Sequence, residues 1–278
     1  MSRNLLLRLS FVLLLVSCDS TGDFEGRARQ VAAQWQGSAD DRAWRTGFVP
    51  LGVLNPYGWI TGRLPSWANR SAHNKAWRLA VTPPSQAPSP APVRWPDGTV
   101  SHVPLVSAAA AYAEVSGSSH LIEDPCPAKG CRQLVFTDVT LGSVPMETSR
   151  GTIQAPAWRF TAEGLDQPFF RVAVDPSVVT PRPTGADPAR IMAFDLVRGR
   201  DLLVRYGFGM CETVEKVLVH ETDRVVVVGV ESSPTGGDGA CPLALKTATA
   251  TVTLARPLGD RLVLDAGGGL PVVRGMKR

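Results

Sequence analysis

The sequence has 278 residues, of which 44% are hydrophobic and 19% charged, a composition typical of a folded protein with ample apolar side chains for its core. Its 29 basic and 25 acidic residues leave a net charge of +4, spread along the chain without a run of like charges. Such a diffuse surplus gives no support to binding of nucleic acid, and we expect no nucleic-acid partner.

The first 18 residues have the pattern of a lipoprotein leader. Arg3 precedes an apolar stretch, residues 5–16, which runs directly into Ser17 and Cys18. With 12 residues, the stretch is shorter than the ~20 that a spanning helix needs, so we expect a signal peptide at residues 1–17. A small residue before a cysteine is typical of a lipobox. The sequence therefore predicts lipid on Cys18, which anchors the protein to the extracytoplasmic face of the cell membrane; an ordinary signal peptide and an uncleaved anchor are the alternatives.

The first part of the mature chain mixes helical and extended patterns. Residues 18–25 are polar and are expected to form a short lipidated tether. An Ala-rich stretch at residues 107–115 favours a helix that Ser107 caps, whereas five prolines at residues 83–92 indicate an exposed loop. Helices are also expected at residues 27–36 and 40–45, and strands at residues 48–53, 77–82, 100–105, 133–141, 153–162 and 169–174.

These elements predict an α+β first domain with an antiparallel sheet, residues 26–174, and a small all-β domain, residues 189–278, in a protein that is mainly β overall. Residues 175–188 hold four prolines and no apolar periodicity, which favours a semi-rigid linker. Strands of the second domain are expected at residues 202–206, 214–220, 224–230, 247–254 and 261–264. The alternation of Thr with apolar residues at 247–254 predicts one buried face, and the apolar run at 225–228 predicts a central strand covered on both faces.

Four cysteines follow Cys18, and an even number in an exported chain indicates disulfides. Three connectivities are possible. We favour Cys126 with Cys131 and Cys211 with Cys241, because each pair then lies on one side of the linker. Zinc is the alternative, but the spacing within the pairs is unlike that of zinc sites, and we expect neither a metal nor a cofactor.

Several segments resemble one protein family along most of the mature chain. They are WRTGFVPL (44–51), VRWPDGTVSHVPL (93–105), TSRGTIQAPAWRFTAEG (148–164) and VRYGFGMC (204–211), followed by ETDRVVVV and RPLGDRLVLD. The segments are similar to those of uncharacterised lipoproteins of high-GC Gram-positive bacteria (actinobacteria). The resemblance implies a lipobox, two later cysteine pairs and a location at the cell envelope. It supplies no activity and no catalytic residue.

The sequence contains no G-x-S-x-G nucleophile elbow, no Walker loop, no G-x-G-x-x-G after a strand and no EF-hand spacing. His220 and Glu221 begin like a zinc-protease motif, but Arg224 stands where the second histidine would be, which favours a histidine at a strand end. The glycine-rich residues 236–239 could form an ion-binding loop or a flexible turn. We favour the turn, because it lets Cys241 reach Cys211.

The tryptophans give the functional hint. All seven precede the linker, and Tyr57, Trp59 and Trp67 fall in an expected loop where aromatic rings can stack on sugars or contact a partner. Burial in the core is the other explanation for each ring. We therefore expect a binding or structural protein of the envelope with an envelope protein or glycan as partner. The alternatives are an envelope-polymer hydrolase with unidentified catalytic residues and a protein that escorts a neighbouring membrane protein.

Overall fold

The computed structural model describes residues 20–54, 64–117, 125–185, 187–236 and 240–275. The chain divides into two compact units. We call residues 37–184 the central unit, and residues 1–36 with 185–278, which come from both ends of the chain, the terminal unit. The protein is mainly β with several antiparallel sheets, and the predicted fold class is confirmed.

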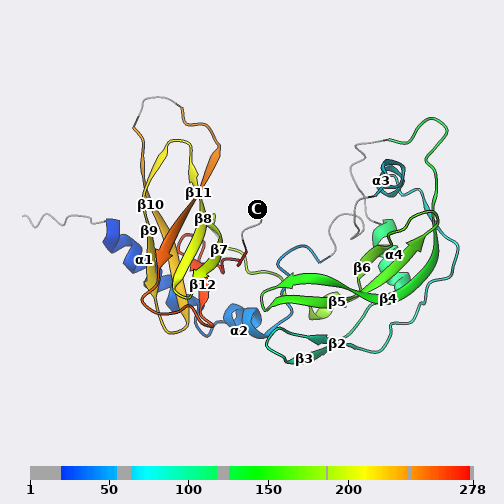
Figure 1. The fold of residues 1–278 in the computed structure, drawn as a ribbon, viewed down its shortest axis with the longest axis horizontal. Coiled ribbons are helices and arrows are strands. Elements are labelled where there is room, and N and C mark those ends of the chain that lie inside the picture. The colour runs from blue at the N-terminus through cyan, green and yellow to red at the C-terminus, as the bar shows by residue number, and fades with distance from the viewer. Residues whose placement is uncertain (1–19, 55–63, 118–124, 186, 237–239, 276–278) are drawn as a thin grey trace, which may run out of the picture. The chain divides into compact units, whose positions relative to one another are not determined.

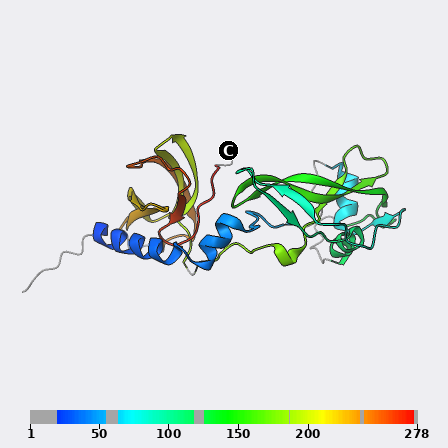
Figure 2. The same ribbon diagram turned by 90° about the horizontal axis from the view of Figure 1, so that it is seen from below.

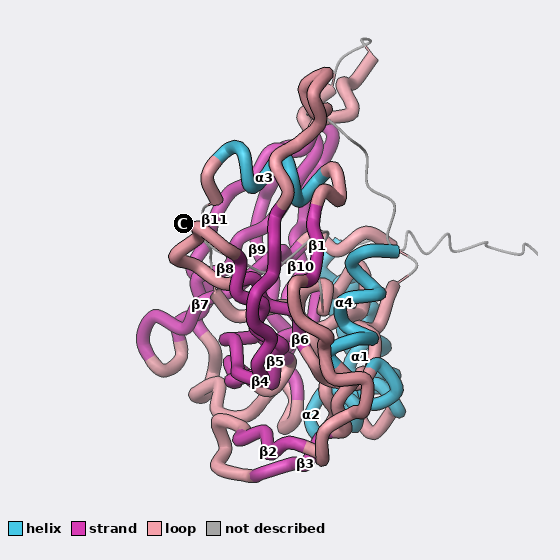
Figure 3. Tube along the Cα trace, turned by 90° about the vertical axis from the view of Figure 1, so that its right-hand side faces the viewer, coloured by secondary structure: helices cyan, strands magenta, loops and turns pink. Residues whose placement is uncertain are grey.

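The central unit is α+β. Its largest sheet has the order β1-β4-β5-β6, in which β1 is parallel to β4 and the other pairs are antiparallel, and β2 and β3 form a separate hairpin. Figure 1 shows β4 and β5 as a long pair, and Figure 3 draws the strands in magenta and the helices in cyan. The elements are α2 (Ala39–Thr46), α3 (Ser66–His73), β1 (Trp77–Leu79), β2 (Ala91–Arg94), β3 (Val100–Val103), α4 (Ala108–Gly117), β4 (Leu134–Thr148), β5 (Gly151–Ala162), β6 (Phe169–Val172) and the 3₁₀ turn η1 (Pro176–Val178).

Aromatic rings fill the core of this unit. Phe136, Phe160 and Phe169, from three adjacent strands, are fully buried, and the ring centroids of Phe136 and Phe169 lie 5.4 Å apart, edge to face. Tyr112 of α4 packs against Phe136 and Phe160. As predicted, Ser107 caps α4, since its Oγ accepts a hydrogen bond from the Ala110 amide at 3.1 Å. The helix is thus held against the sheet by aromatic packing.

The terminal unit has two three-stranded sheets around one core, with orders β11-β8-β7 and β12-β10-β9. β10 is parallel to β12 and antiparallel to β9. As predicted, the four valines 225–228 are fully buried and β11 exposes its threonines on one face. The elements are α1 (Ser20–Trp35), β7 (Ile191–Arg198), β8 (Asp201–Gly209), β9 (Glu212–Glu221), β10 (Val225–Pro234), β11 (Leu245–Thr253) and β12 (Leu262–Asp265), shown in Figure 1.

Helix α1 covers the outer face of the β12-β10-β9 sheet, and Figure 2 shows it lying beneath the strands of the terminal unit. Its buried residues Ala28, Val31, Ala32 and Trp35 have the spacing of one helical face. Val226 and Val228 face the second sheet, so by strand alternation the neighbouring valines face α1. The helix is therefore the second cover that the run of four valines requires.

The position of α1 corrects the predicted organisation. The tether expected at residues 18–25 is helical from Ser20 onward, and the helix expected in the first domain belongs to the C-terminal strands instead. Trp35 accordingly lies in the terminal unit, apart from the other described tryptophans. Amphipathicity predicted a helix here, but it could not show which sheet the apolar face would cover.

Part of the region expected to be a linker is hydrogen-bonded to the central unit, although most of its side chains are exposed. Val179 forms a β-bridge with Phe48, and Arg182 donates a hydrogen bond to the Leu51 carbonyl at 2.9 Å, so residues 175–184 are part of the central unit. The strand expected at residues 48–53 is reduced to isolated bridges at Phe48 and Pro50. The prolines restrict the backbone of this region, but residues 175–184 still belong to the central unit.

Both favoured disulfides are present, Cys126–Cys131 and Cys211–Cys241, with sequence separations of 5 and 30. The first lies in the central unit and the second in the terminal unit. Chain-entropy arguments give the first about 2 kcal/mol of stabilisation and the second about 4 kcal/mol. Each disulfide therefore stabilises its own unit.

Gly229 of β10 provides a test of the α1 packing. A Cβ at this position would lie 2.7 Å from Phe24 Cε2 and 3.1 Å from Ala266 Cβ. We expect Gly229→Ala to lower the free energy of unfolding by about 1–3 kcal/mol, because the added methyl displaces the Phe24 ring. Urea unfolding followed by fluorescence measures the loss. The same substitution in a Phe24→Ala background should cost less, and equal costs in the two backgrounds would contradict the proposed contact.

Candidate functional site

The terminal unit contains a groove of about 690 Å³ beside the N-terminal half of α1. We call it the α1 groove. Its walls are α1, strands β9 and β10, and two turns at residues 187–190 and 265–267. Phe24, Leu218 and Val230 give it an apolar part, while arginine and carboxylate side chains supply both signs of charge. A groove of this size and mixed lining can hold a small molecule or a short segment of chain.

The groove exists because β12 is shorter than β10. β12 pairs with β10 only along Val225–Val228 and ends at Asp265, whereas β9 stays paired with β10 on its other side up to Pro234. Beyond Val228, no strand in the described part of the chain pairs with the β12 side of β10. Open strand edges of this kind can pair with an extended chain.

Asp265 fixes the turns that form one wall. This carboxylate is 1% exposed and accepts hydrogen bonds from the backbone amides of Arg190, Ile191 and Gly268. A buried carboxylate is tolerated in a core only with such partners, and here three amides supply them. The start of β7 and the end of β12 are consequently held together through one side chain.

Two arginines of the groove bridge its walls. Arg27 of α1 donates to the Ala266 carbonyl at 3.1 Å and to the Gly267 carbonyl at 2.7 Å. Arg190 donates to Ser232 Oγ at 2.8 Å and to a Glu212 carboxylate oxygen at 3.0 Å. Both side chains remain about two-fifths exposed, so they present charge to the groove as well as supporting it.

Carboxylates balance these cations. Asp187 accepts from Arg27 at 3.4 Å, and the nearly buried Glu231 lies 3.0 Å from Lys216 Nζ. Asp23 is exposed at the N-terminal turn of α1. The groove therefore carries charges of both signs, which suits a ligand with both donors and acceptors better than a simple anion.

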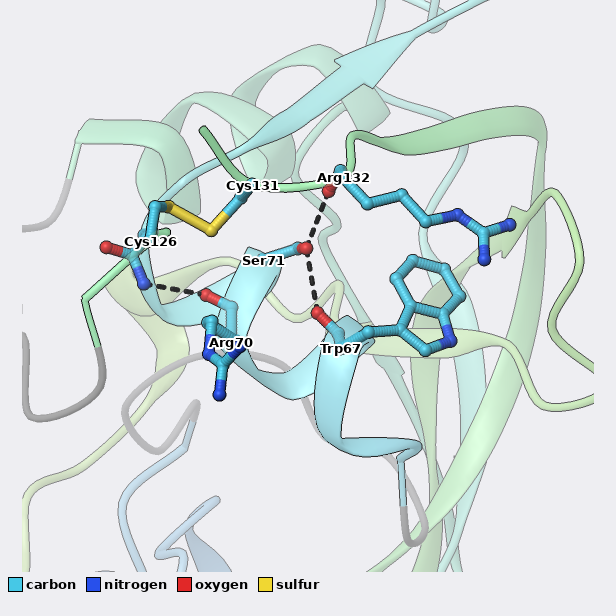
Figure 4. Close-up of a disulfide and its surroundings, with 7 residues drawn as sticks. Trp67, Arg70, Ser71, Cys126, Cys131 and Arg132 are labelled. Atoms are coloured by element: carbon cyan, nitrogen blue, oxygen red, sulfur yellow. Dashed lines mark hydrogen bonds between the residues drawn. A yellow bond between two sulfur atoms is a disulfide. The ribbon is translucent and has the colours of Figure 1, made fainter. Parts of the chain in front are cut away.

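The aromatic site predicted at Tyr57, Trp59 and Trp67 is described only in part. Tyr57 and Trp59 lie outside the described residues. Trp67 is half-buried in α3, and the guanidinium of Arg132 covers its ring at 3.9 Å from the centroid. Figure 4 shows this stack beside the Cys126–Cys131 disulfide, where Ser71 Oγ also contacts the carbonyls of Trp67 and Arg132. One face of this tryptophan is thus already used in packing.

Four other tryptophans, Trp35, Trp44, Trp95 and Trp158, are at most 5% exposed and belong to the core. Trp77 is half-buried at the start of β1. For most of the described rings, burial was therefore the correct explanation. The predicted stacking surface has no exposed tryptophan within the residues that the structure describes.

His220 lies at the end of β9, as predicted, and its Nδ1 is 3.0 Å from a Glu25 carboxylate oxygen of α1. Glu221 instead binds the nearly buried Arg261 at 2.7 Å. Within the described ranges, no three His, Cys, Asp or Glu side chains gather as a metal-binding group. No described helix is long and apolar enough to cross a membrane. The site predicted at Cys18 lies outside the described residues.

Comparison with protein-family models, curated proteins and solved structures finds no match to this chain. The residues of the α1 groove were not singled out in the sequence. Phe24, Arg27, Arg190 and Asp265 are far apart along the chain and belong to no recognisable motif. Only the early ending of one strand and the packing of α1 bring them together.

The contact between Glu212 and Arg190 in the groove wall can be tested through the pH dependence of stability. Its pKa is lowered because its carboxylate accepts the Gly209 amide and the Arg190 guanidinium, although burial opposes the shift. The ionised form is favoured in the folded state, so the stabilisation is present above the unfolded pKa and is lost as the pH falls through the folded one. We expect Glu212→Gln to destabilise the protein at pH 7 and to cost progressively less as the pH falls below the ordinary pKa of glutamate. Urea midpoints of both proteins over a series of pH values measure this, and a loss that does not depend on pH would contradict it.

Proposed function

We propose that this protein is a lipoprotein, anchored to the extracytoplasmic face of the cell membrane by lipid on Cys18, and that it binds a segment of another envelope protein in the α1 groove. The leader at residues 1–17 and the small residue before Cys18 support the anchor. Two disulfides support an oxidising compartment outside the cytosol.

The start of α1 is the observation that carries this proposal. The helix begins at Ser20, two positions after Cys18, and by Phe24 it is packed on the β sheet. Only about 6 Å of helix separates Ser20 from Phe24. A lipid on Cys18 would therefore hold the terminal unit directly at the bilayer, and the α1 groove would lie beside the anchor.

The open edge of β10 favours a protein segment as the ligand. An extended peptide can pair its backbone with a strand edge, and its ends and side chains can match the charges of both signs around the groove. The apolar part at Phe24 and Leu218 suits an aliphatic side chain. The Arg132 stack on Trp67 leaves the glycan site at Tyr57, Trp59 and Trp67 with less support. No observation on the described residues favours the envelope-polymer hydrolase.

The anchor is tested by mass spectrometry of the mature N-terminus purified from membranes. We expect Cys18 to be the first residue and to carry a diacylglyceryl group through its sulfur. Cys18→Ser should abolish the modification completely, whereas the paired substitution Cys126→Ser with Cys131→Ser should leave it unchanged. A mature N-terminus at another residue, or an unmodified Cys18, would show that the anchor is wrong.

Binding in the groove is tested by photo-cross-linking in intact cells. A benzophenone amino acid at Asp23 faces the groove, and the same group at the exposed Ala33 lies on the same helix away from it. We expect a cross-linked protein partner from position 23 and none, or a several-fold weaker product, from position 33. The groove is not the binding site if both positions give the same products or if neither gives any.

A further inference from the structure

We propose that the terminal unit touches the bilayer through a second point besides the lipid, an apolar tip formed by Met210, Leu243 and Leu245. The inference rests on the proposed function, because the bilayer is placed by the lipid on Cys18. The tip would set the orientation of the terminal unit on the membrane and hold the α1 groove close to the lipid surface.

The three side chains are exposed to an unusual degree for their size. Met210 is 43% exposed, Leu245 is 63% exposed and Leu243 is 109% exposed. Long apolar side chains scattered singly are normal on a protein surface, but a group of them marks a contact with a membrane or a partner. Their arrangement therefore decides whether they form one surface.

Hydrogen bonds and strand pairing bring the three residues together. The Met210 amide donates to the Ala244 carbonyl at 3.2 Å, and Ala244 lies between Leu243 and Leu245 in the chain. Leu245 also pairs with Gly209 across β11 and β8. The Cys211–Cys241 disulfide joins the same two chain segments. The tip is thus one covalently stapled surface at the end of the strands.

The register of β9 and β10 shows that this tip lies toward the N-terminal end of α1. At the C-terminal end of the helix, Gln36 donates to Thr222 in the β9–β10 turn at 3.2 Å. Twelve residues earlier, Phe24 contacts Gly229, which pairs with Leu218 in the middle of the ladder. Following α1 back toward Ser20 therefore leads away from the turn and toward Pro234, which pairs with Glu212 beside Cys211.

The distances are compatible with simultaneous contact. From Gly229 to the end of β10 at Pro234, the strand extends about 17 Å. Ser20 lies about 6 Å along α1 from Phe24, and the two residue steps from Ser20 to Cys18 add at most about 7 Å. The lipid and the tip can therefore reach one membrane surface from a single orientation of the terminal unit.

The chemistry beside the tip also suits a membrane surface. Lys246 follows Leu245 and holds its ammonium 4.7 Å from the centroid of the Phe208 ring. A lysine behind apolar side chains can keep its charge at the level of anionic headgroups while the apolar groups enter the acyl region. Without a membrane, the side chains of Met210, Leu243 and Leu245 stay exposed to water.

The test uses the full acylated protein with a single environment-sensitive fluorophore (NBD) attached at Leu243→Cys. The matched control is Val197→Cys, which is 55% exposed near the β7–β8 turn at the other end of the strands. Both proteins are reconstituted into vesicles of phosphatidylethanolamine and phosphatidylglycerol that carry doxyl-labelled lipid. Mass spectrometry first establishes that Cys18 is acylated.

We expect a blue-shifted emission at position 243 and quenching by the doxyl lipid several-fold stronger than at position 197. If the protein is acylated and the two positions are quenched equally, the tip does not touch the bilayer, while the proposed anchor stands. Cross-linking between position-243 thiols in place of quenching would mean that a second copy covers the tip, and would also overturn the inference. An unacylated protein overturns the proposed function and this inference with it.

Discussion

The packing of α1 on the outer face of the β12-β10-β9 sheet is the constraint on which the terminal unit depends. The four valines of β10 are buried on both faces, and without the helix one of those faces would be open to water. The glycine at position 229 allows the Phe24 ring to approach the strand closely. Because the helix precedes the central unit in sequence, its burial makes the terminal unit discontinuous.

Because of that discontinuity, the proposed lipid anchor would be attached to the terminal unit. In a chain of two consecutive domains, lipid at the N-terminus would attach to the first domain and leave the second remote from it. Here the helix that follows Cys18 is part of the unit formed by the C-terminal strands. The same helix forms one wall of the α1 groove, so the groove would lie close to a lipid on Cys18.

The groove walls combine buried polar contacts with exposed charge. Asp265 holds the start of β7 through backbone amides, and Arg190 reaches from there to β9 and β10. These interactions fix the lining while leaving both arginines partly accessible. A preformed site of this kind binds with a smaller entropy cost than one that must become ordered with its ligand.

Local sequence patterns predicted many of this protein's strands, a helix cap and both disulfides. Strand alternation at residues 247–254, the double-sided valine run at 225–228, the cap at Ser107 and the four cysteines after Cys18 each predicted a feature that the structure has. The lipobox predicts a location, and it rests on sequence alone because Cys18 lies outside the described residues. These features depend on neighbours in the chain, which a single sequence displays directly.

Tertiary structure alone decided the rest. Helix periodicity showed that residues 27–36 have an apolar face, but the partner of that face is a strand about 200 residues later in the sequence. The α1 groove depends on where β12 ends relative to β10, and the apolar tip depends on the register between β8 and β11. Contacts between distant segments are set by the packing of whole faces, and no local sequence signal records them.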